Sequence, residues 1–195
     1  KKKQELDADE KGIKLFAKSK YDFDAIENAF YVLMYSYLPI EDKKFDKSLL
    51  QCGHLNIPDS ILYAEYNEIT AVEDYDDTEH THPNIKTRIE ESYTIIDQYD
   101  NENRDKFIIS KDRFHKTRNL ARFSLINNYL ADKNYIRAIY HTNMVKKDIP
   151  VNRFLTISEI KAFYGLATLF NAEETEICFD FYGNDEGEIS YLYNY

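Results

Sequence analysis

The chain has 195 residues, of which 43% are hydrophobic, and a formal net charge of −10. Its length and apolar content suffice for a single domain, residues 1–195, with a sizeable core. No segment approaches the roughly 18 uninterrupted apolar residues of a membrane span, and no apolar segment follows the N-terminal lysines, so the sequence predicts neither a transmembrane helix nor a signal peptide. A pI near 5.0 argues against a general nucleic-acid coat protein and a polybasic membrane anchor.

The cysteines and the lack of catalytic motifs further limit the class of protein that the sequence can encode. Cys52 and Cys178 are far apart and form no CxxC pair. Two reduced, buried thiols are typical of a cytoplasmic protein, and a single long-range disulfide is the alternative. The sequence has no Gly-rich phosphate loop, no GxSxG motif and no recognisable Cys–His arrangement. We therefore predict a cytoplasmic protein without a cofactor, and a binding protein rather than an enzyme.

The first predicted elements are two helices. Residues 4–19 have a weak helical pattern. A stronger helix follows, because Asp24 and Glu27 resemble a capping box and Pro39 ends the apolar run. The face of this second helix that we expect to enter the core carries Ile26, Ala29, Phe30, Leu33 and Tyr37.

The next segments are short or polar. Residues 47–51 fit a helical turn. Residues 60–72 fit a helix, although their β-branched content also allows a strand. Residues 73–84 form a polar, acidic loop, and another helix can begin at residues 85–91.

Two β-hairpins are predicted in the second half of the chain. One spans about residues 93–109, because β-rich runs flank the polar, turn-prone residues 100–105. A helix over residues 85–99 is the alternative there. The second hairpin spans about residues 176–193, where apolar and polar residues alternate on either side of a Gly-containing turn.

Helical patterns dominate between the two predicted hairpins. Residues 112–131 and 133–146 predict a pair of helices joined by a short turn. A capping box formed by Thr156 and Glu159 predicts a further helix that ends near Asn171. The inward face of that helix is expected to carry Ile160, Phe163, Ala167 and Phe170. The predicted fold class is therefore α+β, a compact domain with a helical majority and two β-hairpins.

Charge is sorted into blocks along the chain. Residues 59–105 contain 14 acidic and 3 basic residues, whereas residues 106–153 contain 11 basic and 3 acidic residues. Residues 154–195 are acidic again, with 8 acidic residues and a single lysine. Segregated charge creates fields that favour a complementary partner. The chain also has 17 tyrosines and no tryptophan, which suits a protein–protein surface, although codon bias in an AT-rich genome explains the same composition.

The acidic blocks predict a non-enzymatic, inhibitor-like or immunity-like module that binds a basic surface of a partner protein. Strong charge complementarity would accelerate association with such a surface. The residues expected to contact the partner are Glu73, Asp74, Asp76, Asp77, Glu79, Asp185 and Glu186.

The basic block supports an alternative, a protein that binds or processes nucleic acid through residues 106–153. Lysine and arginine neutralise phosphates, and interleaved Asn and aromatic residues can contact bases. The candidate residues are Lys116, Arg118, Arg122, Arg137, Lys146 and Lys147. Two other interpretations are that these cations pair with carboxylates inside the fold, or that they dock on an acidic protein partner.

His80 and His82 lie within the acidic loop and are weak candidates for metal ligands. Imidazole together with carboxylate suits Zn²⁺, Mn²⁺ or Fe²⁺. No HExxH or comparable second half follows in the sequence. A solvated acidic loop is therefore the simpler interpretation, and no metal is predicted.

Overall fold

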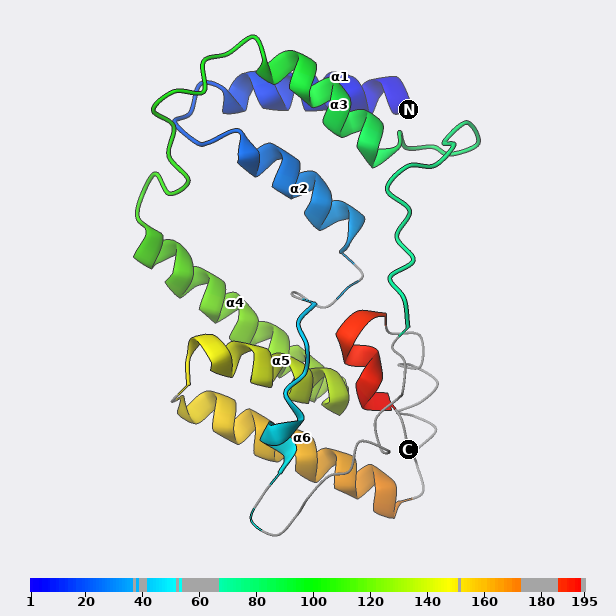
Figure 1. The fold of residues 1–195 in the computed structure, drawn as a ribbon, viewed down its shortest axis with the longest axis vertical. Helices are drawn as coiled ribbons and strands as arrows, with labels where there is room; N and C mark the ends of the chain where they lie inside the picture. Colours follow the sequence, from blue (N-terminus) through cyan, green and yellow to red (C-terminus); the bar gives the residue numbers. More distant parts are fainter. Residues whose placement is uncertain are drawn as a thin grey trace. The chain divides into compact units, whose positions relative to one another are not determined.

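The computed structural model is helical (Figure 1). It describes residues 1–36, 38, 42–51, 53, 67–150, 152–172 and 186–193. Both cysteines, Asp185 and most of the predicted second hairpin lie outside these ranges. The helices among the described residues are α1 (Lys2–Phe16), α2 (Asp24–Met34), η1 (Lys47–Leu50), α3 (Ile85–Ile96), α4 (Lys111–Ala131), α5 (Tyr135–Asp148), α6 (Arg153–Asn171) and η3 (Gly187–Tyr193), where η marks a 3₁₀-helix.

The chain divides into two compact units. Unit 1 combines Lys1–Tyr37 with Ala71–Phe114, and unit 2 combines Leu38–Thr70 with His115–Tyr195. No described helix has the length and apolar character needed to cross a membrane.

The α+β prediction is wrong, because the described residues contain no β-strand beyond the isolated bridge between Tyr21 and Asp105. In the predicted hairpin at 93–109, α3 continues to Ile96 and the residues from 97 to 110 are irregular. The alternative prediction, a helix over residues 85–99, was closer to the observed helix α3. β-Branched residues 94–96 are helical because α3 packs against α1 and α2, and tertiary packing overrides weak local propensity. In the predicted hairpin at 176–193, the described end is the 3₁₀-helix η3.

Unit 1 is built around α3, which packs against both α1 and α2. Its buried apolar side chains are Ile13, Phe23, Phe30 and Ile89. The loop that joins α1 to α2 is held against the residues that follow α3 by Arg104. The guanidinium of Arg104 lies 4.0 Å from the ring centre of Phe23 and donates to the carbonyl oxygens of Ala17 and Ser19 at 3.0 and 2.9 Å. These contacts satisfy carbonyls at the C-terminus of α1 that a helix end leaves unpaired.

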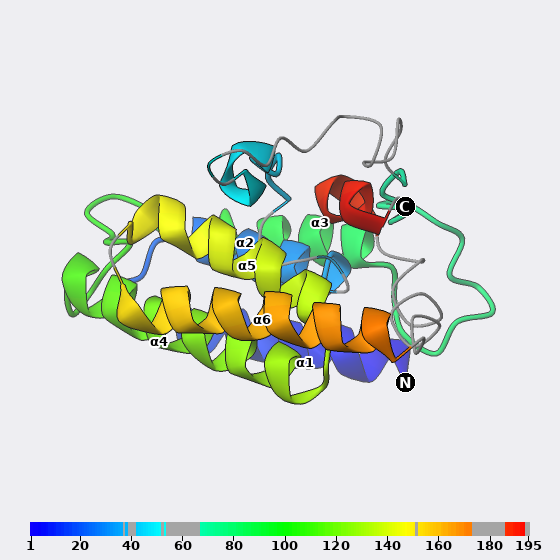
Figure 2. The same cartoon turned by 90° about the horizontal axis from the view of Figure 1, so that it is seen from below.

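Unit 2 is built around α5, whose residues are buried from Ala138 to Val145. α4, α5 and α6 run side by side with alternating direction (Figure 2). Ile126 of α4, Val145 of α5 and Leu155 of α6 form one apolar cluster. On the other side of α5, Phe45 stacks on Tyr140 with a centroid distance of 6.3 Å, and η3 contributes Ile189. Gly165 of α6 is buried against the ring of Tyr135, where no side chain would fit.

Several predicted helix boundaries differ from the structure. The cap of α2 is Phe23 rather than Asp24, and Asp22 accepts a hydrogen bond from the Asp24 amide at 3.0 Å. The helix ends at Met34, whereas Tyr37 and Pro39 lie outside the described residues. In the predicted helix over 60–72, the described residues 67–72 are not helical.

The start and the inward face of α6 were also predicted wrongly. Asn152 caps the helix by accepting hydrogen bonds from the amides of Phe154 and Leu155 at 2.9 and 3.3 Å. The predicted capping box at 156–159 therefore lies inside the helix. The inner face carries Leu155, Ser158, Ala162, Gly165 and Leu169, while the residues expected inside, Ile160, Phe163, Ala167 and Phe170, are exposed.

Candidate functional site

The acidic loop at residues 73–84 of unit 1 is tied to α1 through Asp77. The Lys2 ammonium lies 2.9 Å from Asp77 Oδ1 and also contacts the Asp77 carbonyl oxygen. The other carboxylate oxygen, Oδ2, accepts a hydrogen bond from the Asn84 amide at 2.6 Å. The hydrogen bond from Lys2 is the main cause that lowers the pKa of Asp77. Asp77 is therefore an anchor of the loop.

Asn84 fixes the other end of the same loop. Its side chain is buried, donates to the Tyr75 carbonyl at 2.6 Å, and caps α3 by accepting from the Lys86 amide at 2.9 Å. Asp76 closes a turn by accepting from the Thr78 amide at 2.9 Å, and its contacts with Thr78 lower the pKa of Asp76. These side-chain caps hold the loop backbone in a defined conformation.

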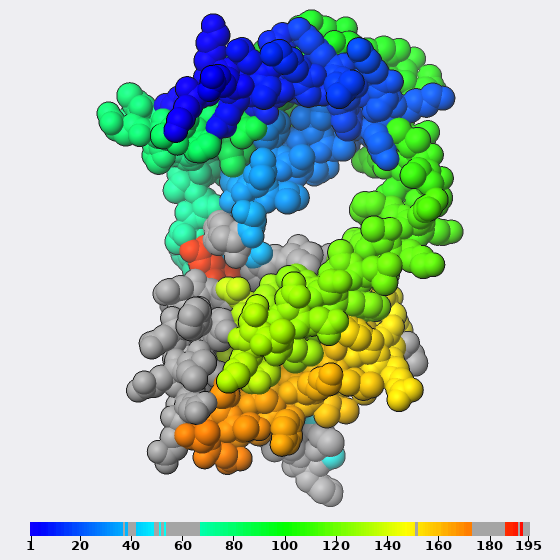
Figure 3. Space-filling view, turned by 180° about the vertical axis from the view of Figure 1, so that it is seen from behind, coloured from blue at the N-terminus to red at the C-terminus, as the bar shows by residue number. Residues whose placement is uncertain are grey.

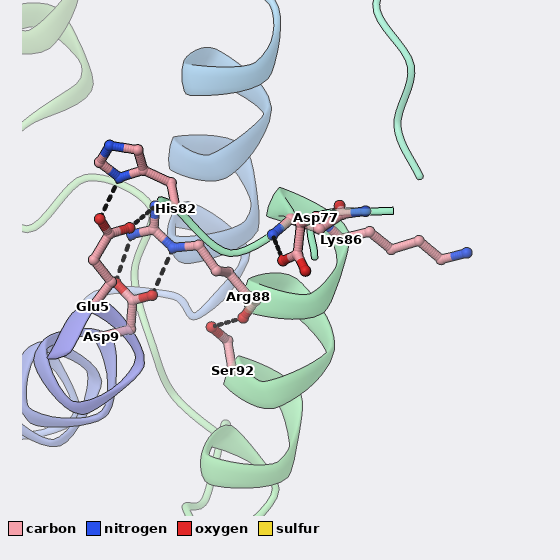
Figure 4. Close-up of polar contacts among 8 residues, drawn as sticks. Glu5, Asp9, Asp77, His82, Lys86, Arg88 and Ser92 are labelled. Atoms are coloured by element: carbon pink, nitrogen blue, oxygen red, sulfur yellow. Dashed lines mark hydrogen bonds and ion pairs between the residues drawn. The ribbon is translucent and has the colours of Figure 1, made fainter. Parts of the chain in front are cut away.

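Arg88, near the start of α3, joins this helix to α1 (Figure 4). Its guanidinium forms a bidentate pair with Asp9, with N–O distances of 2.7 and 2.8 Å, and lies 3.6 Å from Glu5. The same guanidinium lies 5.0 Å from the ring centre of Phe30 on α2. The hydrogen bond to Asp9 raises the pKa of Arg88. This partly buried group therefore links all three helices of unit 1.

The two loop histidines lie in different surroundings. The His80 ring packs on Tyr75 with a centroid distance of 5.2 Å, whereas His82 Nδ1 contacts a carboxylate oxygen of Glu5. Among the residues that the structure describes, no three His, Cys, Asp or Glu side chains are grouped as metal ligands.

An exposed set of carboxylates surrounds Lys86 at the start of α3. Asp74 lies 2.8 Å from the Lys86 ammonium, and this contact is the main cause that raises the pKa of Lys86. Glu90 and Glu73 raise it further, so both lie near the same cation. Glu73 also accepts a hydrogen bond from the Tyr35 hydroxyl at 2.6 Å. We define the acidic face as these three carboxylates, Glu73, Asp74 and Glu90, together with two further exposed carboxylates, Glu79 of the same loop and Glu91 of α3.

Of the two predicted acidic residues of the tail, Glu186 is described by the structure, and it belongs to unit 2. Glu186 accepts hydrogen bonds from the amide of Thr70, at 2.7 Å, and from its hydroxyl. Nearby, the Asn67 amide donates to Ser190 Oγ at 2.8 Å. Glu186 thus fastens the residues before 71 to the start of η3.

Half of the predicted nucleic-acid-binding cations are paired inside unit 2. The Arg122 side chain is 5% exposed and lies 2.7 Å from Asp148, and Arg118 lies 3.7 Å from the same carboxylate. The hydrogen bond from Arg122 is the main cause that lowers the pKa of Asp148. Lys146 pairs with Glu159 of α6.

The other three candidates differ in exposure. Lys147 is exposed and donates to the Lys44 carbonyl at 3.1 Å. Lys116 is exposed on α4, and Arg137 is half-buried on α5. These six residues of the basic block therefore do not form one continuous basic surface.

Sequence reasoning missed the residues that position the acidic face, namely Lys2, Asp9, Asn84 and Arg88. One local signal was present, since an Asn directly before a helical pattern is typical of an N-cap. The pairs to α1 join residues more than 70 positions apart and leave no local signal. Comparisons with protein-family models, curated proteins and solved structures found no match.

Proposed function

We propose that this chain is a non-enzymatic, inhibitor-like interaction protein whose acidic face on unit 1 binds a basic surface of a partner protein. The observation that carries the proposal is that some acidic residues of the loop bind its backbone while neighbouring ones remain exposed. Asp76 and Asp77 hold the backbone of the loop, whereas the carboxylates of the acidic face are exposed, and three of them, Glu73, Asp74 and Glu90, lie near Lys86.

Pre-organisation supports binding because a loop that is already ordered loses less conformational entropy when a partner docks. Exposed carboxylates of one sign also accelerate association with a basic surface. Unit 1 has 19 acidic and 13 basic residues, so its net charge has the same sign as the acidic face.

The internal pairing of the basic block favours this proposal over nucleic-acid binding. A cation that is already paired with a carboxylate of the same unit has little to gain from a phosphate, and it releases fewer counterions. Arg118, Arg122 and Lys146 are in that position.

The test compares two triple variants of the full chain that change the net charge equally. Glu79→Gln with Glu90→Gln and Glu91→Gln removes charge from the acidic face, and Asp7→Asn with Asp97→Asn and Glu102→Gln removes it from other exposed positions. Each protein is used to capture partners from the source lysate, and proteins and nucleic acid are both identified. The captured protein is then purified and its Kd measured over a range of salt concentrations.

We expect a captured protein with a basic surface. Its Kd should rise by about tenfold in the acidic-face variant and by less than about threefold in the control variant. Added salt should weaken wild-type binding. Equal losses in both variants, binding insensitive to salt, or capture of polynucleotide alone would contradict the proposal.

A further inference from the structure

The outer face of α6 in unit 2 is apolar and uncovered. Ile157, Ile160 and Tyr164 are 40%, 61% and 75% exposed and recur at helical spacing. Phe163, 38% exposed, and Ala167 widen the same face. We call these five residues the α6 stripe. α6 lies at the surface of unit 2 beside α4 (Figure 3).

The α6 stripe is not needed to hold α6 in place. The helix packs on unit 2 through its opposite face, which includes the small residues Ser158, Ala162 and Gly165. Between Leu155 and Leu169, which are also buried, the inner face thus carries small residues, while the larger apolar residues Ile160 and Tyr164 are exposed. Contiguous exposed apolar residues of this kind mark interaction sites in soluble proteins.

The charges beside the α6 stripe are positive. Arg153 and Lys161 are exposed and make no ion pair with any residue that the structure describes. Glu159, the acidic residue within α6, is neutralised by Lys146. The local charge is therefore opposite in sign to the −10 of the whole chain.

We infer that the α6 stripe docks into an apolar groove of a second partner protein whose rim carries Asp or Glu residues. Apolar anchors spaced along one helix face are the pattern of helix-in-groove recognition. From Ile157 to Ala167 the anchors extend over about 15 Å of helix axis. The groove supplies apolar walls for the stripe, and its acidic rim pairs with Arg153 and Lys161. This interface uses a different unit and the opposite charge from the acidic face, so it does not depend on the proposed function.

The first test uses the dye 1-anilinonaphthalene-8-sulfonate, which combines apolar rings with a negative charge. Ile160→Ala with Tyr164→Ala removes the largest anchors, and alanine preserves helix propensity. Arg153→Glu with Lys161→Glu reverses the charge, and a Glu at the first position of α6 suits the helix dipole. Leu120→Ala on α4, 57% exposed, is the matched control. We expect dye fluorescence to fall at least about threefold in both double variants and to stay unchanged in the control.

The second test places a photo-crosslinking amino acid at position 164 of the full chain in the source lysate. The cross-linked peptide should come from an apolar groove that contains Asp or Glu. With that protein purified, each double variant should raise Kd by about tenfold or more, and Leu120→Ala should not.

Other outcomes overturn the inference. These are cross-linking to a second copy of this chain, to a basic or polar surface, or to nothing, and a Kd that is indifferent to Arg153→Glu with Lys161→Glu. Circular dichroism of each variant, expected to match the parent, separates loss of docking from loss of folding.

Discussion

The acidic loop of unit 1 and the basic helices of unit 2 both concentrate one sign of charge in the sequence, but they use that charge differently. In unit 1, Asp76 and Asp77 cap backbone amides and leave the neighbouring carboxylates exposed. In unit 2, Arg118 and Arg122 converge on the single carboxylate of Asp148. Charged residues that cluster in the sequence therefore remain exposed where the segment is a loop. Where the segment is a packed helix, some of them form ion pairs within the fold.

The same difference is seen between two arginines that form ion pairs, Arg88 in unit 1 and Arg122 in unit 2. Arg88 serves two carboxylates, Asp9 and Glu5, that stand one turn apart on α1. Among the described residues, Arg122 pairs with the carboxylate of Asp148, whose side chain is 40% exposed and can be solvated without it. Replacing each arginine in turn measures how much each unit depends on its ion pairs.

The largest effect is expected for Arg88→Met. Methionine keeps the apolar stem near Phe30, but it removes the bidentate partner of Asp9 and leaves Asp9 and Glu5 partly buried and mutually repulsive, with Glu5 still in contact with His82. We expect a loss of about 3 kcal/mol in the free energy of unfolding, measured by urea denaturation. The control is Lys86→Met, which removes an exposed cation and should change the free energy of unfolding far less than Arg88→Met does. Similar losses in the two variants would show that Arg88 is not the link between the helices.

A smaller loss in the free energy of unfolding, about 2 kcal/mol, is expected for Arg122→Met, because Asp148 can recover part of its hydration.

The pair of Arg122 and Asp148 also predicts that stability depends on pH. The folded state lowers the pKa of Asp148, so its contribution is complete at neutral pH and is lost as the pH falls through the folded-state pKa. The stability difference between parent and variant should therefore shrink in acid. Lys116→Met, an exposed change on the same helix, should show neither effect.

The interior of α5 predicts a change of the opposite sign. Asn143 is fully buried, and neither its Oδ1 nor its Nδ2 has a hydrogen-bond partner among the residues that the structure describes. Replacing an unsatisfied amide by an apolar side chain of similar size removes its desolvation cost. Asn143→Leu should raise the free energy of unfolding by about 1 kcal/mol. The exposed change Asn128→Leu should have little effect, and a destabilised Asn143→Leu would show that the amide holds a partner in solution.

Strongly periodic helices could be predicted from the sequence, and the inner face of α6 could not. The helices over 111–131 and 135–148 lie within two residues of the predicted bounds, because apolar residues recur at helical spacing within each. Ile126 of the first helix and Ile136 and Met144 of the second are buried. In α6 the same logic selected Ile160 and Phe163, since it ranks residues by hydrophobicity. The structure instead buries Gly165, where the Tyr135 ring needs space, and that requirement comes from another helix.

The candidate site shows the same division between local and distant information. Glu73, Asp74 and Glu79 were found because acidic residues cluster in the sequence. The ion pairs that hold this region in place were not predicted, because Lys2 and Arg88 bind carboxylates that are far away in the sequence and near only in the folded chain. The predicted hairpin at 93–109 failed for a related reason, since α3 gains more from packing on α1 and α2 than β-branched residues lose in a helix.

The most local effect expected is a single titration in unit 1. A hydrogen bond with the Glu27 carboxylate raises the pKa of Tyr93 to about 12. Since this exceeds the value of about 10 for an unperturbed tyrosine, the contact contributes fully below that pH and is lost as the pH rises toward the folded-state pKa. NMR titration of the Tyr93 ring should show the raised midpoint, and Glu27→Gln should lower it because the negative charge is gone. Asp7→Asn, which removes a charge from α1 instead, should leave the midpoint unchanged; if it moves the midpoint as far as Glu27→Gln does, the general charge of unit 1 rather than the Glu27 contact controls this phenol.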